Sequence, residues 1–91
     1  MARPPLERIV AAVTGHFGCD AASWAAGRRS ADAARAVAAY LARSSFGYSA
    51  TEVAGALGYR GPSSVSHAVR RIEEGSKTLR SAVRELEARL G

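Results

Sequence analysis

Apolar residues recur every three or four positions along most of the 91-residue chain, in short segments that end near glycines. This spacing places them on one face of an α-helix. The first segment, residues 5–17, carries its apolar residues at i, i+3, i+4, i+7 and i+11 from Leu6, and Gly18 follows as a helix stop. No stretch alternates apolar and polar residues between turn signals, as half-buried strands do. The pattern therefore predicts an all-α protein with little or no sheet.

About six helices, packed as one compact domain over residues 1–91, account for this pattern. The expected segments are Pro5–Phe17, a short helix after Asp20 that turns Trp24 inward, a third capped by Ser30 and ending near Ser45–Gly47, a fourth from Ser49 to Gly58, a fifth capped by Ser63, and a sixth after Gly75 and Ser76. The fourth opens with a capping box, in which Ser49 and Glu52 bond each other's backbone N–H groups.

The charge of the chain is basic and unevenly distributed. Thirteen basic and eight acidic residues give a net charge of +5, and twelve of the basic residues are arginine. Residues 28–71 hold seven arginines against two acids, whereas basic and acidic residues balance from Glu73 onward. Such an excess indicates nucleic acid first, and an anionic membrane or an acidic protein second.

A single cysteine, Cys19, excludes an internal disulfide and fits a reducing compartment. The start of the chain has no apolar run typical of a signal peptide, and no stretch is long enough to span a membrane. We therefore expect a cytoplasmic protein that associates with the nucleoid and not with a membrane.

The predicted fifth helix has two contrasting faces. One carries Val65, Ala68, Val69 and Ile72; the other carries Ser63, Ser66, His67 and Arg70, flanked by Ser64 and Arg71. The polar face holds no acid before the last turn of the helix. Hydroxyl, imidazole and guanidinium groups suit base edges and the phosphates beside them. A solvated polar face with no ligand is the simpler alternative.

The fourth and fifth helices, joined by a turn at Gly58–Pro62, predict a helix-turn-helix. In this motif the first helix crosses the DNA backbone and the second enters the major groove. A glycine after the first helix supplies the left-handed cap that the bend requires.

The stretch GYRGPSSVSHAVRRIE, residues 58–73, resembles the signature of the C-terminal DNA-binding domain of the bacterial replication initiator DnaA. The matching positions are Gly58, Arg60, Val65, His67, Ala68 and Ile72, with Ser63 and Ser64 in place of two threonines. The resemblance continues without a gap through residues 40–58 and more loosely back to the first helix. It implies a Trp-repressor-like helical bundle with a helix-turn-helix.

The resemblance also implies roles for individual residues. Arg28 and Arg29 correspond to a basic loop that enters the minor groove, and Arg35 and Arg71 correspond to phosphate contacts. The main chain at Ala50 and Thr51 would meet the DNA backbone. The residues expected at the DNA are Arg28, Arg29, Arg35, Ala50, Thr51, Arg60, Ser63, Ser64, Ser66, His67, Arg70 and Arg71, with Arg43 as a further phosphate contact.

The sequence departs from the family at one informative place. Gly61 and Pro62 replace an Asp-His pair that helps to recognise the bases of the initiator's DNA box. A related domain of transposases that act on repetitive elements has a looser signature, similar to the SSVSHA stretch at residues 63–68. Both families remain candidates, and either resemblance implies an N-terminal domain or a partner protein that accompanies this chain.

The sequence offers no catalytic or metal-binding arrangement. His67, His16 and Cys19 have no spacing that fits a zinc site, and no nucleophile–base or carboxylate pair is placed for catalysis. No phosphate-binding G-x-x-x-x-G-K-[ST] loop is present, so no nucleotide cofactor is expected.

We therefore expect a non-enzymatic domain that binds double-stranded DNA with sequence preference, as in recognition of a replication origin. The first alternative is the DNA-binding module of a repetitive-element transposase or a stand-alone regulator. The second is a basic protein-interaction module that binds no DNA.

Overall fold

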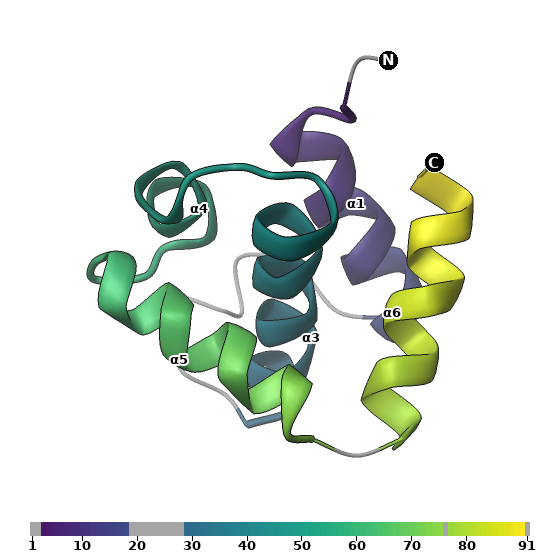
Figure 1. The fold of residues 1–91 in the computed structure, drawn as a ribbon. Coiled ribbons are helices and arrows are strands. Elements are labelled where there is room, and N and C mark those ends of the chain that lie inside the picture. Colours follow the sequence, from purple (N-terminus) through teal and green to yellow (C-terminus); the bar gives the residue numbers. More distant parts are fainter. Residues whose placement is uncertain (1–2, 19–28, 76, 91) are drawn as a thin grey trace.

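The computed structural model of the protein describes residues 3–18, 29–75 and 77–90, which form helices and turns with no strand among them (Figure 1). The described elements are α1 (Leu6–Phe17), α3 (Arg29–Tyr40), a π-helical turn η1 (Leu41–Ser45), α4 (Ala50–Leu57), α5 (Pro62–Glu73) and α6 (Lys77–Leu90). The predicted all-α class is confirmed for this part of the chain. The short helix expected after Asp20, with Trp24, lies outside the described residues.

The central helix of the bundle is α3, and α1, α4, α5 and α6 all contact it (Figure 1). Its sequence permits this position because Ala34, Ala36, Val37, Ala38 and Ala39 are each at most 2% exposed. A helix buried on most sides must be apolar on most sides. Alanine adds little bulk, so the neighbouring helices can approach the α3 backbone closely.

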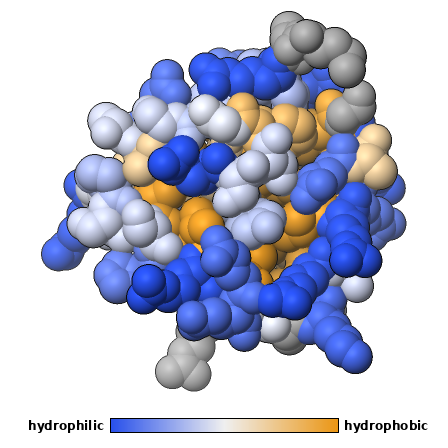
Figure 2. All heavy atoms as spheres, viewed as in Figure 1, coloured by the Kyte–Doolittle hydropathy of each residue, from blue (hydrophilic) through white to orange (hydrophobic). Residues whose placement is uncertain are grey.

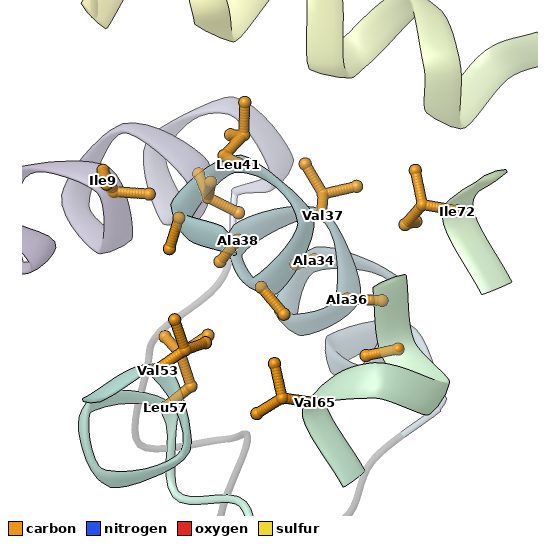
Figure 3. Close-up of a cluster of buried hydrophobic side chains, with 14 of the residues drawn as sticks. Ile9, Ala34, Ala36, Val37, Ala38, Leu41, Val53, Leu57, Val65 and Ile72 are labelled. Atoms are coloured by element: carbon orange, nitrogen blue, oxygen red, sulfur yellow. The ribbon is translucent and has the colours of Figure 1, made fainter. Parts of the chain in front are cut away.

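The core consists of larger aliphatic side chains that surround this alanine-rich helix. Figure 3 shows Ile9 from α1, Val53 and Leu57 from α4, and Val65 and Ile72 from α5 directed toward α3. Burying each such side chain stabilises the fold by roughly 1.5–3 kcal/mol. The helix-turn-helix is therefore fixed to the rest of the domain through the inner faces of both its helices.

Most helix ends form as their sequences predict. Gly18 ends α1 and Gly58 ends α4, both in the left-handed region, with φ of 66° and 74°. The capping box of α4 is complete. The Glu52 N–H donates to Ser49 Oγ at 3.1 Å, and the Ser49 N–H donates to the Glu52 carboxylate at 3.0 Å.

Two predicted N-caps are wrong. The N-cap of α5 is Gly61, in extended conformation, and Pro62 is the first helical residue, so Ser63 already lies in the first turn. Proline favours this first position because its fixed φ suits a helix and its missing N–H has no intrahelical partner there. The third helix begins at Arg29, which places Ser30 inside it and not at its cap.

The third helix ends where its sequence predicts, but through a wider turn. In η1 the Phe46 N–H donates to the Leu41 carbonyl at 3.0 Å, and the Tyr48 N–H donates to the Ala42 carbonyl at 2.9 Å. Gly47 then turns the chain toward α4 with a φ of 73°. None of the helices in the described ranges has both the length and the apolar character needed to cross a bilayer.

Candidate nucleic-acid interface

The helix-turn-helix consists of α4, a turn over residues 58–61, and α5. The N–H groups of Gly58 and Tyr59 both donate to the Ala54 carbonyl, which closes the end of α4 and bends the chain sharply. The two helices pack against each other and against α3. This rigid support fixes the direction in which the outer face of α5 points.

The two faces of α5 are separated as its sequence predicts. Val65, Ala68 and Ile72 are buried, and Val69 is half-buried. The polar side chains are exposed, apart from the half-buried Ser64; the exposed ones are Ser63, Ser66, His67, Arg70 and Arg71. The structure therefore brings six of the predicted contact residues together on one helix surface.

The polar residues of α5 line shallow, open hollows on both sides of the helix. Ser63, Ser66, His67 and Arg70 line one hollow together. Arg43, from η1, lines a neighbouring hollow that also includes Ser66, Arg70 and, at its far end along α5, Glu73. A guanidinium from a second element thus extends the basic surface beyond α5 itself.

On the opposite side of α5, Ser64, His67 and Arg71 line a further hollow beside Tyr59 in the turn. His67 borders hollows on both sides and is exposed. Its ring lies near the middle of the polar face, where it can approach a ligand bound over either side.

The positive charges at this surface are not neutralised within the described part of the chain. There, the one pair of a basic and an acidic side chain within 4.0 Å is His16 Nδ1 and a Glu85 carboxylate oxygen, at 3.9 Å. Arg60, Arg70 and Arg71 are exposed and have no carboxylate partner among the described residues. Their charge is therefore directed to solvent or to an anionic ligand.

The first turn of α5 offers few main-chain donors. Pro62 has no N–H, and the Ser64 N–H already donates to the Gly61 carbonyl at 3.1 Å. The Ser66 hydroxyl donates to the Pro62 carbonyl at 3.3 Å, which leaves its oxygen able to accept. Side chains are therefore the main hydrogen-bonding groups that this end of α5 presents to solvent.

The start of α4 differs, because its main chain does offer donors. The capping box uses the N–H groups of Ser49 and Glu52. Helix geometry leaves the N–H groups of Ala50 and Thr51 without intrahelical acceptors. Thr51 is exposed and Ala50 half-buried. An anion such as a phosphate can approach this helix end favourably.

Arg35, an expected phosphate contact, lies against the turn of the helix-turn-helix. Its Nη2 donates to the Gly58 carbonyl at 2.6 Å, and its guanidinium carbon lies 4.0 Å from the centre of the Tyr59 ring. This arrangement joins α3 to the turn. The sequence alone does not predict this contact, because no local spacing relates Tyr59 to an arginine 24 positions earlier.

The remaining predicted basic contacts are less fully defined. Arg28 lies outside the described residues, and the side chain of Arg29 is also not among those described. Arg43 is exposed, and its Nη1 donates to the Tyr48 carbonyl at 3.2 Å. Tyr48 packs inward, and its hydroxyl donates to the Pro4 carbonyl at 2.7 Å.

Among the described residues, no three histidine, cysteine, aspartate or glutamate side chains lie close enough together to hold a metal ion. The arrangement around α5 is suited to binding a large anion over an exposed surface.

Comparison with known proteins bears on this arrangement. The chain matches the family model of the bacterial DnaA protein helix-turn-helix over residues 6–72, which extend from the start of α1 almost to the end of α5. No curated protein and no solved structure matches it. The family match includes the whole of α4, the turn and the polar face of α5, and it implies binding of double-stranded DNA. The chain belongs to the bacterial DnaA helix-turn-helix family.

Proposed function

We propose that this protein is a double-stranded DNA-binding domain with sequence preference and without catalysis of its own. One observation carries the proposal: the outer face of the second helix of a helix-turn-helix presents Ser63, Ser66, His67 and Arg70 together, with no ion-paired acid among the described residues. Side chains of these types bond base edges in the major groove, and arginine bonds guanine through two parallel hydrogen bonds.

The affinity and the sequence preference come from different residues in this proposal. Arg43 and Arg71, with Arg28 and Arg29, contact phosphates and supply most of the affinity. The main-chain N–H groups at the start of α4 fix the orientation of the domain on the duplex. Ser63, Ser64, His67 and Arg70 bias the choice of sequence.

The finer function that we propose is recognition of a DNA box of the kind bound by the replication initiator. At Gly61 and Pro62 no side-chain donor replaces the family's Asp-His pair. The bases contacted by that pair should therefore contribute less to specificity here. Recognition of a different site, as in a transposase or a stand-alone regulator, is the alternative that this departure favours.

Fluorescence anisotropy tests the proposal directly. The protein would be titrated with duplexes carrying the initiator's box, a scrambled duplex of equal length, and heparin, each at low and near-physiological salt. Tighter binding to the box supports initiator-like recognition. Tight binding to both duplexes supports a DNA-binding domain with another target, which selection from random duplexes would identify.

The same titration distinguishes the protein-interaction alternative. A basic surface that serves an acidic protein partner has no need of duplex geometry. Binding to heparin as tight as binding to either duplex, or no duplex binding at either salt concentration, would reject the DNA-binding proposal in favour of that alternative.

A further inference from the structure

The last helix, α6, has a basic outer surface that the family match over residues 6–72 does not include. Lys77, Arg80, Ser81 and Arg84 follow one another at helical spacing and together line one shallow hollow. All four are exposed. We call this set the α6 basic face. It carries three positive charges and no acid.

The acidic residues of α6 lie to either side of this face and contact other helices. Glu85 lies 3.9 Å from the His16 ring of α1. Glu87 accepts a hydrogen bond from the Ser45 hydroxyl of η1 at 3.2 Å. The charges from residue 73 onward balance in number, and Glu87 shares a second hollow with Arg80 and Arg84, but the α6 basic face itself holds no acid.

The three cations differ in how far they are engaged within the protein. Arg80 Nη2 donates to the Glu73 carbonyl, and Arg80 and Arg84 also border a second hollow whose rim includes Glu73 and Glu87. No carboxylate of the described residues lies within 4.0 Å of Lys77 or Arg84. Lys77 and Arg84 are therefore the residues whose charge is most available to a ligand.

The α6 basic face points away from the proposed DNA interface. The buried residues of α6, which include Val83 and Leu86, turn its opposite side toward α1 and α3. In Figure 1, α4 and the start of α5 lie on the left, α6 lies on the right, and α3 stands between them. Hydrophilic side chains prevail at the lower right of the same view in Figure 2. A duplex bound along α4 and the start of α5 would approach the domain from a different side than this face.

We propose that the α6 basic face binds the phosphate backbone of a second segment of duplex DNA, so that one molecule can hold two segments. The inference rests on the proposed function for the first segment. Three exposed cations along about two turns of helix complement the regularly spaced phosphates of a duplex, and they bind without base specificity.

The chemistry and the setting together favour a DNA segment as the occupant. Three phosphate contacts give weak binding, with a log–log salt slope of about −3. Weak binding is sufficient when the second segment belongs to the same long DNA molecule, because tethering raises its effective concentration. No comparable tethering would support an acidic protein at this face.

Binding stoichiometry tests the inference. Sedimentation velocity at low salt, with short labelled duplexes in excess, counts duplexes per protein molecule. The test variant is Lys77→Gln/Arg84→Gln, which retains Arg80 and its bond to Glu73. The matched control is Arg8→Gln/Arg89→Gln, which removes the same charge from exposed positions outside the α6 basic face. Single-duplex affinity is measured in parallel by anisotropy.

The expected result is two duplexes per molecule for the wild type and the control, and one for the test variant, whose affinity for the second duplex falls about tenfold. Its affinity for the first duplex stays unchanged. One duplex per molecule for every variant would overturn the inference and leave the proposed function standing. Equal losses in test and control variants, or binding of polyglutamate in place of a second duplex, would also overturn it. No duplex binding at all would reject the proposed function itself.

Discussion

The Arg35 guanidinium bonds the Gly58 carbonyl and stacks on Tyr59, whereas Arg70 and Arg71 extend from α5 into solvent. The same side chain can serve both settings, because a planar guanidinium stacks on rings and also forms paired hydrogen bonds to anions. Arg35 fixes the turn that directs α5. Arg70 and Arg71 form part of the surface that α5 presents.

Replacing Arg35 should therefore affect stability more than DNA affinity. We expect Arg35→Ala to lower the free energy of unfolding by about 2 kcal/mol, since a charged hydrogen bond and a cation–π contact are both lost. Arg35→Lys should restore only part of the lost stability, because an ammonium group cannot stack on the Tyr59 ring as a planar guanidinium does. Urea denaturation measures the effect. Unchanged stability, with a salt slope of DNA binding lower by about 1, would instead indicate a phosphate contact.

Arg70 and Arg71 should respond differently to truncation. Arg71→Ala should weaken binding about equally on all duplexes and lower the salt slope by about 1, as expected for one phosphate contact. Arg70→Ala, and likewise His67→Ala, should cost roughly 1–3 kcal/mol more on the preferred site than on random duplex, because a base contact is lost. Anisotropy on both duplexes measures this. Equal losses on the two duplexes for all three variants would refute the division between affinity and specificity.

At the level of the helices, most boundaries follow from local signals. Gly18 and Gly58 adopt the left-handed conformation that ends a helix, and the Ser49 capping box forms as its sequence predicts. The N-cap of α5 is an exception: residue preference alone favours Ser63, whereas the structure has Gly61 at this position. Serine is the better cap by type, but Pro62 is more favourable inside the first turn than before it, and this moves the N-cap of α5 back to Gly61.

Two glycines of α4 should respond in opposite ways to alanine. Gly55 lies within the helix, is exposed, and an added Cβ meets nothing within 4 Å, so Gly55→Ala should stabilise the fold by about 0.5–1 kcal/mol. At Gly58 there is also space, but its φ of +74° makes Gly58→Ala destabilising by about 1–2 kcal/mol. Thermal unfolding of the two variants measures both effects. A destabilised Gly55→Ala or a neutral Gly58→Ala would contradict this account.

For the whole molecule, the arrangement of helices depends on α3, whose importance the sequence shows only indirectly. The alanines of α3 do not mark one face of the helix as apolar. Their spacing therefore predicts a helix, but it does not predict that four other helices surround it. The polar face of α5 could be predicted because its residues lie within three turns of one helix. Two other features could not be predicted, because both depend on how distant segments pack. They are the contact of Arg35 with Tyr59 and the outward direction of the α6 basic face.

Enlarging an alanine of α3 should test this central position. Ala38 is fully buried, so Ala38→Leu should lower the free energy of unfolding by about 1–3 kcal/mol through overpacking. Ala56→Leu adds the same atoms at an exposed position of α4 and should change stability by less than about 0.5 kcal/mol. Urea denaturation compares the two. Similar effects at both positions would show that α3 is not tightly enclosed.

The π-helical turn η1 has a consequence for how the length of the chain can vary in evolution. A π-turn contains one residue more than the α-helical turn that it replaces. Deleting one exposed residue there, such as Ser44, leaves enough chain to reach Gly47 by an ordinary α-helical turn. The same deletion within α3 would rotate every following side chain by about 100° and expose the alanine face. We therefore expect homologous sequences to differ in length at η1 and to keep the length of α3 constant.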